Sequence, residues 1–400
     1  MRKKLGILIC TLLVSGCGNV NSSALNKVNK RNGEYAQLSA QYVEASKRFA
    51  STSFSKITND NFIFSPMSIE TTYALILDGS DGNSKKQLSD ALNFSNVDYQ
   101  NETSRFIKNN MINNAETKLS IDQSLWIDYD IVPNIKDDFI KNATDKYFTE
   151  LYKINYAKSK KDMVNWAMKK SHSKIKMSEE EFGDGPLVIM NSIYLKANWD
   201  NQFDERDDTD EEFNNLDNSK SKVTMMNNYY QRMAVYSLDD AIVFSLKLSS
   251  GLSVNYLLPN EIKSSEYLNE RVDNLLNYSS LDWDMYNVHL ATPKFQEETN
   301  IDVKDILIKE GVNDIYNKNN ADLSSMSSKG LYIEKSVQKS HISFDHKGVE
   351  GASVTSAILT PTSPGPAMKE MEIKLNRPFI YSITDNDGLP LFIGKKMSFK

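Results

Sequence analysis

Cysteine is almost absent from this chain of 400 residues, because its two cysteines, Cys10 and Cys17, both lie near the N-terminus. The rest of the chain therefore has no structural disulfide, no cysteine-ligated zinc site and no cysteine nucleophile. Histidine is scarce too, and the four residues, His172, His289, His341 and His346, lack metal-ligand spacing. We expect no metal, no cofactor, and a domain that is stable through its core alone.

Motifs of the common catalytic sites are missing as well. The sequence contains no GxSxG, HExxH or GxxxxGK[ST] pattern. The stretch at residues 388–395 has two glycines, but no hydroxyl residue follows its lysine, so it is not a phosphate-binding loop. The sequence therefore predicts that the protein is not an enzyme.

Net charge is small for the size of the chain. Its 47 basic and 53 acidic residues give −6, which excludes a general attraction to nucleic acid. The acidic run at residues 204–212 has no glycine turn to order its oxygens around a cation, and we interpret it as a solvated loop. A lysine-rich stretch is either a polyanion-binding surface or, more simply, a solvated helix face; its members are Lys158, Lys160, Lys161, Lys169, Lys170, Lys174 and Lys176.

Glycine and proline are sparse, with 16 and 10 residues, which argues against a chain rich in linkers. The hydrophobic share of 40% is enough for a large core. Helical spacing of apolar residues predicts helices at 34–50, 68–77, 85–92, 162–170 and 303–310, and strands are predicted mainly later, at 187–194, 241–248, 252–258, 288–295 and 334–345. Without a repeat or an internal linker, this order favours a single α+β domain over residues 34–400.

Residues 1–16 have the layout of an export signal. A positively charged start is followed by an apolar run at 5–14, which is too short to span a bilayer of about 30 Å. The sequence LVSGC at 13–17 resembles a bacterial lipoprotein box, which implies lipidation of Cys17 rather than an ordinary signal with an incidental cysteine. Residues 17–33 are polar and predict a flexible tether. We expect an exported lipoprotein, anchored to a membrane at the cell surface or facing the periplasm.

One segment near the C-terminus combines two opposite tendencies. Residues 348–360 lack proline, are mostly small or β-branched and carry one charge, Glu350, whereas three prolines fall within 361–366. The first part has the composition of a strand, and the second cannot join a sheet because proline lacks the backbone donor. The segment is either an ordinary surface strand with its loop or a spare strand that can insert into a sheet.

Several motifs, taken in order, resemble those of the serpin family. Residues 61–69 read NFIFSPMSI, and residues 191–199 read NSIYLKANW, followed by Phe203, Thr209 and Phe213. Shorter matches are VTMM at 223–226, LP at 258–259, PKF at 293–295, ADLS at 321–324, NRPF at 376–379 and PLFIGK at 390–395. Each motif alone is moderately specific, but their order and spacing make the chain similar to serpins from about residue 34 to 399.

The resemblance implies a serpin fold, with a large central, mostly antiparallel sheet, further sheets, about eight or nine helices and an exposed reactive-centre loop at about 346–375. It also implies a protease inhibitor that acts as a suicide substrate. In serpins a protease cleaves the loop and forms an acyl-enzyme; the loop then inserts into the main sheet and drags the protease across, which distorts its active site. The implied partner is a target protease in a covalent complex, and we expect a monomer that binds no nucleic acid.

The resemblance assigns the hinge of the loop to Gly348, Val349, Glu350, Gly351, Ala352, Ser353, Val354 and Thr355. If Val349 faces the sheet interior, strand alternation also turns Gly351, Ser353 and Thr355 inward, and no charge is buried. In that register Glu350 faces outward, but alternation alone leaves the register open, because the outward face also carries the apolar Ala352 and Val354.

The reactive bond has two candidate positions. Counting forward from the hinge glycine places it between Thr362 and Ser363, whereas counting back from the NRPF motif places it near Ala367 and Met368, because the span is a few residues longer than is typical. We prefer the first, since hinge length governs insertion. Residues 348–368 contain no lysine or arginine, which favours elastase-like or subtilisin-like targets, or papain-like ones, over trypsin-like targets.

The resemblance places the region where the sheet opens at Ser65, Ser68, Asn191 and Gln338. Gln338 stands where serpins commonly have histidine; its amide can still hydrogen-bond Ser65, Ser68 or Asn191, but it cannot titrate. His346 stands where the family usually has a glutamate that pairs with a lysine matching Lys294. The sequence therefore does not supply the usual anchor for the loop.

Overall fold

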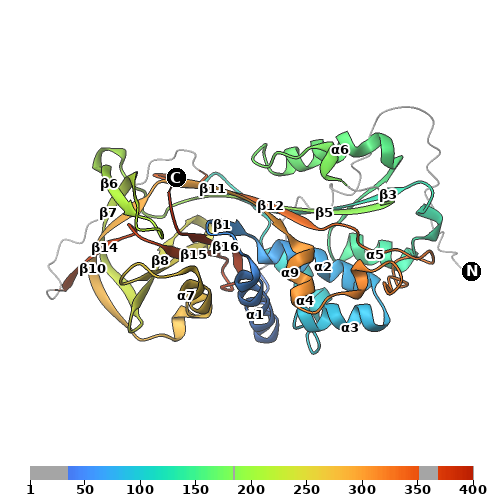
Figure 1. Cartoon of the computed structure of the whole chain (residues 1–400), viewed down its shortest axis with the longest axis horizontal. Helices are drawn as coiled ribbons and strands as arrows, with labels where there is room; N and C mark the ends of the chain where they lie inside the picture. Colours follow the sequence, from blue (N-terminus) through green and yellow to red (C-terminus); the bar gives the residue numbers. More distant parts are fainter. Residues whose placement is uncertain (1–34, 183–184, 351–367, 400) are drawn as a thin grey trace, which may run out of the picture.

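Two β-sheets organise the protein, as a computed structural model that describes residues 35–182, 185–350 and 368–399 shows (Figure 1). The main sheet has seven strands in the order β11-β12-β13-β5-β3-β2, with β4 beside β3. Its strands are β2 (Ile112–Asn113), β3 (Thr117–Asp128), β4 (Glu150–Ile154), β5 (Leu187–Asn198), β11 (Phe295–Asp302), β12 (Val337–Asp345) and β13 (Gly348–Val349). Neighbouring strands are antiparallel except β3 and β4.

The second sheet has nine strands in the order β1-β16-β15-β9-β8-β7-β10-β14, with β6 beside β7. These are β1 (Phe62–Phe64), β6 (Thr209–Asn214), β7 (Lys220–Ser237), β8 (Ala241–Lys247), β9 (Ser253–Pro259), β10 (Trp283–Pro293), β14 (Lys369–Lys374), β15 (Phe379–Thr384) and β16 (Pro390–Lys396). The hairpin between β8 and β9 turns at Ser249–Gly251, as the sequence predicts. Strands β10 and β14 run parallel, and the remaining pairs of this sheet are antiparallel.

Nine α-helices lie within the described ranges: α1 (Ala40–Lys56), α2 (Pro66–Gly79), α3 (Gly82–Ala91), α4 (Tyr99–Asn109), α5 (Asp137–Asp145), α6 (Tyr156–Lys170), α7 (Ser265–Glu270), α8 (Val272–Leu276) and α9 (Val303–Lys309). Figure 1 shows α2, α3, α5 and α9 on one side of the main sheet and α6 on the other. The α+β prediction and the expected helix number are confirmed.

Helix α2 runs beneath the main sheet and begins at Pro66, two residues before the predicted start at residue 68. The Ser65 hydroxyl accepts a hydrogen bond from the Ser68 amide at 3.2 Å, and Pro66 occupies the first turn, where its missing N–H costs nothing. Most of the helix is buried, including Glu70, whose carboxylate accepts a hydrogen bond from the Ser46 hydroxyl of α1 at 2.9 Å. The helix therefore presents polar side chains as well as apolar ones to its surroundings.

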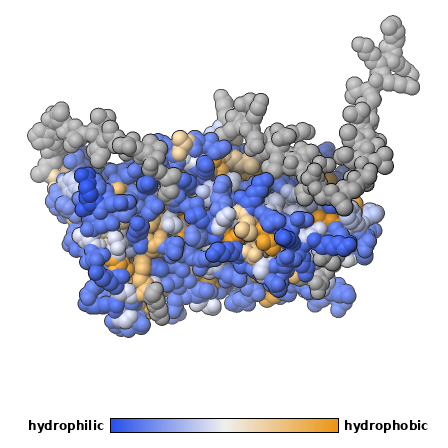
Figure 2. Space-filling model, turned by 90° about the horizontal axis from the view of Figure 1, so that it is seen from above, coloured by the Kyte–Doolittle hydropathy of each residue, from blue (hydrophilic) through white to orange (hydrophobic). Residues whose placement is uncertain are grey.

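Helix α6 covers the opposite face through a second apolar cluster, which contains Trp126, Ile154, Tyr156, Met163, Trp166, Ala167 and Met190. Its Lys170 is an exception to the predicted solvated lysine face, because Nζ lies 2.6 Å from Asp122 and 2.5 Å from Glu150. The other α6 lysines remain at least partly exposed. The face that carries α6 is mostly hydrophilic, with hydrophobic side chains in small separate areas (Figure 2).

Several sequence predictions need correction. The first helix begins at Ala40 rather than at residue 34, because Ser39 caps it, and α4, α5 and β7 were not among the predicted elements. Strand β12 begins at Val337 rather than at residue 334, and His346 lies in the turn that follows it. The acidic run is not wholly a solvated loop, since β6 begins at Thr209.

Two further features concern ligands and membranes. Within the described ranges, no group of three or more histidine, cysteine, aspartate or glutamate side chains is placed to hold a metal ion. None of the helices in the same ranges combines the length and hydrophobicity needed to cross a bilayer.

Candidate strand-insertion site

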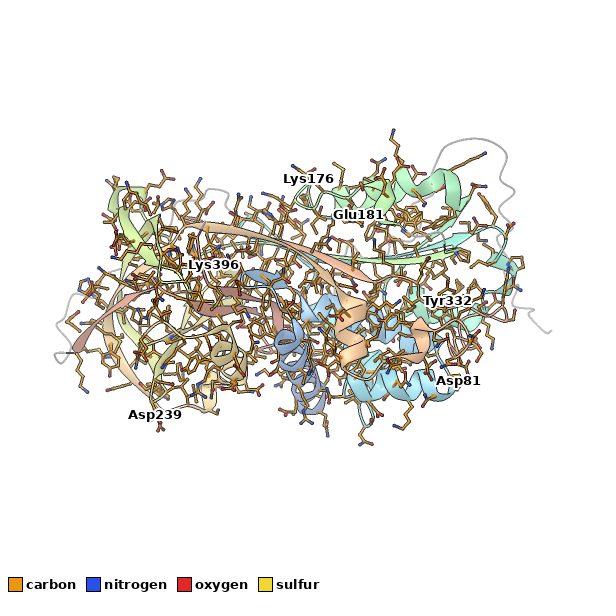
Figure 3. All side chains as sticks on the ribbon, in the orientation of Figure 1. Asp81, Lys176, Glu181, Asp239, Tyr332 and Lys396 are labelled. Atoms are coloured by element: carbon orange, nitrogen blue, oxygen red, sulfur yellow. The ribbon has the colours of Figure 1, made fainter. Side chains whose placement is uncertain are left out.

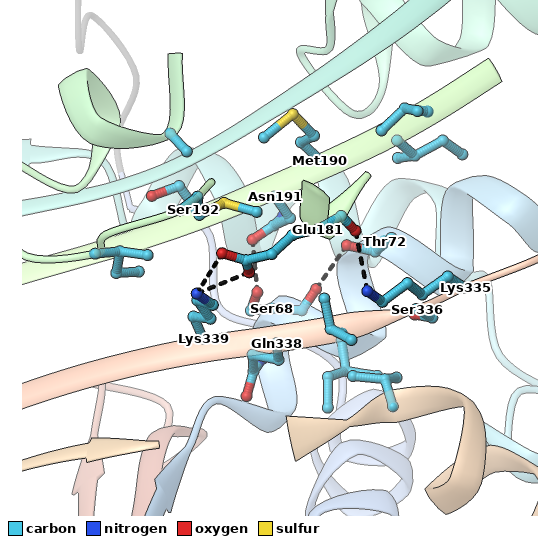
Figure 4. Close-up of a pocket in the computed structure, with 18 of the residues that line it drawn as sticks. Ser68, Thr72, Glu181, Met190, Asn191, Ser192, Lys335, Ser336, Gln338 and Lys339 are labelled. Atoms are coloured by element: carbon cyan, nitrogen blue, oxygen red, sulfur yellow. Dashed lines mark hydrogen bonds and ion pairs between the residues drawn. The ribbon is translucent and has the colours of Figure 1, made fainter. Parts of the chain in front are cut away.

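The main sheet contains a slot between β5 and β12. In the described part of the chain these strands are joined only through β13, whose Val349 pairs with Phe344 of β12 and Ala197 of β5. Beyond β13 a cavity of about 260 Å³ separates them, lined by both strands, by α2 and by the segments that precede β5 and β12 (Figure 4). Both strands use their other edges to pair with β3 and β11, so beyond β13 no strand of the described residues pairs with the edges that face the slot.

The floor of the slot is formed by the N-terminal turn of α2, which is tied to both strands. Gln338 of β12 receives a hydrogen bond from the Ser65 amide at 2.9 Å and donates one to the Ser65 carbonyl at 2.8 Å. On the other side, the Ser68 hydroxyl donates to Asn191 of β5 at 2.7 Å. The structure thus brings together the four residues of the expected opening region, and Gln338 bonds Ser65 rather than Ser68 or Asn191.

Side chains alternate cleanly across the slot. On β12, Gln338, Ser340, Ile342 and Phe344 are buried, whereas the residues between them are half-buried and face the side of α6. Val349 is fully buried, and its partner in the ladder, Phe344, is 1% exposed, so both face the core. The inward register that alternation leaves open is therefore the one that these two residues adopt.

A segment after α6 bridges the outer mouth of the slot. We call residues 171–182 the strap. Nζ of Lys339 on β12 lies 2.7 Å from Oε2 of Glu181 and donates to the Lys176 carbonyl at 2.8 Å (Figures 3 and 4). Lys335 donates to the Glu181 carbonyl at 3.0 Å. Burial acts to raise the pKa of Glu181, but the hydrogen bonds from Lys339 and the Ser178 amide, together with the charges of Lys339 and Lys335, outweigh it and leave that pKa below its usual range.

The turn between β12 and β13 is anchored by a pair that sequence reasoning missed. Nε2 of His346 lies 2.8 and 2.9 Å from the two carboxylate oxygens of Asp208, and Nδ1 lies 3.6 Å from Glu205. The His346 carbonyl also accepts a hydrogen bond from the Phe203 amide at 3.0 Å. Lys294, the expected lysine, is exposed. The acidic run at 204–212 was the available signal, because it contains the carboxylates that His346 contacts.

Several expected residues lie outside the described ranges. They are Cys17 with the signal and tether, Gly351, Ala352, Ser353, Val354 and Thr355 of the hinge, and Thr362, Ser363 and Ala367 of the two candidate bonds. The described hinge residues are Gly348, Val349 and Glu350. Met368 is half-buried and directly precedes β14. The reactive bond and the lipidation site therefore remain predictions.

Comparisons with known proteins agree with this architecture. The family model described as "Serpin (serine protease inhibitor)" matches residues 44–399. An uncharacterised serpin-like protein of Methanosarcina acetivorans is 26% identical, with 98% of this chain and 95% of that protein aligned. The leukocyte elastase inhibitor of Equus caballus is 28% identical over 84% of this chain and 92% of its own length. The native state of the thermophilic serpin tengpin superposes with a TM-score of 0.78 at 24% identity, covering 92% of this chain and 96% of its own.

Proposed function

Because this chain belongs to the serpin family, we propose that it inhibits proteases as a suicide substrate and that the slot between β5 and β12 accepts its own cleaved loop. The observation that carries the proposal is β13, since Gly348 and Val349 already occupy the first two positions of a strand between them. The loop needs only to continue in the same direction to complete the sheet. The covalent acyl-enzyme and the distorted protease follow from the mechanism that is general to the family.

The register of β13 defines where each further residue would lie. Continuing both ladders places Thr355 opposite Gln338 and Asn191, at the floor of the slot. Because the side-chain period of a strand is two, Gly351 and Ser353 would also face inward. About ten new ladder bonds of ~1 kcal/mol each, together with burial of apolar side chains, give on the order of ten kcal/mol. This gain is comparable to the whole stability of a typical domain, which supports its use to hold a distorted protease.

A substitution at Thr355 tests the proposal. Thr355→Arg puts a charge over the floor of the slot at Ser65, beside Gln338 and Asn191, so insertion should stall and the protease should hydrolyse the acyl-enzyme. We expect the variant to be cleaved as a substrate while the wild type forms a complex that survives SDS. The matched variant Ala352→Arg places the same charge on the outward face and is expected to keep most inhibition. Equal inhibition by Thr355→Arg and wild type contradicts insertion.

The target class is proposed from the loop and from one relative. The loop offers no basic residue over 348–368, and a relative that is 28% identical is named for inhibition of leukocyte elastase. We therefore propose elastase-like or subtilisin-like serine proteases, with papain-like enzymes also in the test panel. In that panel, clean loop cleavage without a complex indicates a decoy substrate, and no cleavage indicates a tethered binding protein of the serpin fold.

We also propose that the inhibitor works as a monomer at a membrane surface. The lipoprotein box at 13–17 supports lipidation of Cys17, and the polar residues up to 33 give the domain a tether. Such an anchor would keep the inhibitor at the surface of the cell that exports it. The protection of that cell from external proteases is the role that this placement suits.

A further inference from the structure

Glu350, the last hinge residue within the described ranges, has a backbone conformation that glutamate rarely adopts. Its φ is +60°, in the left-handed region that favours glycine. Its amide still donates to the Ser343 carbonyl at 2.8 Å, so the contact with β12 extends to this residue. Since this backbone is intrinsically unfavourable for glutamate, other contacts must hold it.

Those contacts are made by the carboxylate. Oε1 of Glu350 accepts a hydrogen bond from the Tyr194 hydroxyl of β5 at 3.1 Å and lies 3.3 Å from Nζ of Lys174 in the strap. His172, also in the strap, stacks on Tyr194 with ring centroids 4.0 Å apart. The Glu350 side chain is only 15% exposed, so water screens this pair incompletely. The strap thus holds Glu350 at one end and Lys339 of β12 at the other.

A second lysine, Lys196, lies next to the position that Glu350 would occupy after insertion. In the continued register of β13, residue 350 is opposite Ser343 on β12 and Lys196 on β5, on the outward face. On its other side Lys196 is paired with Lys118 of β3, and like charges directly opposite each other destabilise a sheet. A carboxylate beside Lys196 would relieve that repulsion.

We propose that Glu350 is a positioning residue for insertion. Its carboxylate exchanges its ion-pair partner, from Lys174 to Lys196, as the hinge enters the slot. Its contacts with Lys174 and Tyr194 hold a left-handed backbone at residue 350, which is incompatible with continuing β13 as an extended strand. When Glu350 releases them, the backbone at residue 350 becomes extended and the carboxylate meets Lys196. This inference rests on the proposed function, because it describes how the insertion step begins.

The two lysines make opposite predictions for the uncleaved protein. On mild heating, a metastable serpin-type sheet can take up its intact loop, which is measured as conversion to a monomer that melts at a higher temperature. Lys174→Met removes the partner of the open state, so this conversion should be about three- to tenfold faster. Lys196→Met removes the partner of the inserted state and should slow it by a similar factor. Lys169→Met, on the exposed face of α6, is the control and should leave the rate unchanged.

The Glu350 variants test whether the lysines act through this carboxylate. In the Glu350→Gln background, Lys174→Met and Lys196→Met should each have little further effect on the conversion rate. In the background of the conservative variant Glu350→Asp, part of each lysine's effect should return. The proposed exchange of partners is wrong if wild type converts and the Lys174 and Lys196 variants convert at the same rate. It is also wrong if the effects of these variants persist in the Glu350→Gln background. The proposed function itself fails if the wild type gains no heat stability under either treatment, mild heating or cleavage of its loop.

Discussion

Glu70 provides a quantitative test of the core beneath the main sheet. This carboxyl group lies on α2, has no exposed surface and accepts a hydrogen bond from Ser46 of α1 at 2.9 Å. Burial disfavours its charged form and raises its pKa from 4.5 to about 8, even though the hydroxyls of Tyr42 and Ser46 stabilise the anion. At neutral pH, Glu70 is therefore protonated in the folded protein and ionised in the unfolded chain.

The sign of the effect on stability follows from proton binding. Between pH 4.5 and about 8 the folded state holds a proton on Glu70 that the unfolded state has lost, so the free energy of unfolding falls as pH rises. The contribution of this group is fully present below pH 4.5 and is lost by about pH 8. At 1.36 kcal/mol per pH unit, the loss at pH 7 is about 3 kcal/mol, and at pH 8 it is about 5 kcal/mol.

Urea denaturation of Glu70→Gln measures this term. Glutamine keeps a carbonyl oxygen for Ser46 and has no proton to lose, so the variant should be more stable than wild type by an amount that grows from pH 5 to pH 8. Other titrating groups cancel in this difference. Glu44→Gln, an exposed change on α1 whose side chain is 66% accessible, should show almost no growth with pH. A difference between Glu70→Gln and wild type that stays constant over this range would refute the reasoning.

Two further predictions concern the loop anchor and the N-terminus. His346→Glu installs the glutamate that is usual in the family, but it places it against Asp208, so we expect a loss of about 3 kcal/mol in chemical denaturation and recovery when Asp208→Lys is added. If His346→Glu alone were as stable as wild type, the assigned pair of His346 and Asp208 would be contradicted. Cys17→Ser should move the exported protein from the membrane fraction to the soluble one, and unchanged membrane association would exclude a lipid anchor at this residue.

The parts of the fold that sequence predicts well are those set by neighbouring residues. The helix predicted at residues 68–77 lies within α2, although the cap is Ser65 and the helix begins two residues earlier, and the apolar run that begins at Leu187 identifies the central strand β5. The turn at Ser249–Gly251 likewise joins β8 and β9 as expected. Each of these signals is local, so it can be read without knowing what the element packs against. The order of family motifs supplied the rest of the architecture.

The parts that escape prediction depend on partners far away in the chain. Burial of Glu70 follows from packing against α1 and Ser46, and nothing in its own helix marks it as buried. The pair of His346 with Asp208 joins residues 138 positions apart. Helix α4 is polar on average, and its buried residues include Glu102. A search for regularly spaced apolar residues therefore does not detect this helix. In each case the tertiary environment decides what a polar side chain does.

The hinge shows how two residues resolve an ambiguity that extends over the whole segment. Alternation permits either face of the hinge to enter the sheet, but a one-residue slip exchanges every side chain between the faces. The β13 ladder removes this freedom. At Gly348 a Cβ atom would lie 2.0 Å from the Ala197 carbonyl oxygen, so the strand can approach β5 this closely only with glycine there. Val349 is then buried, and Glu350 must face outward. The alternative register would turn the single charge of the hinge into the core, whereas the proposed insertion in the register of β13 would bury only uncharged side chains.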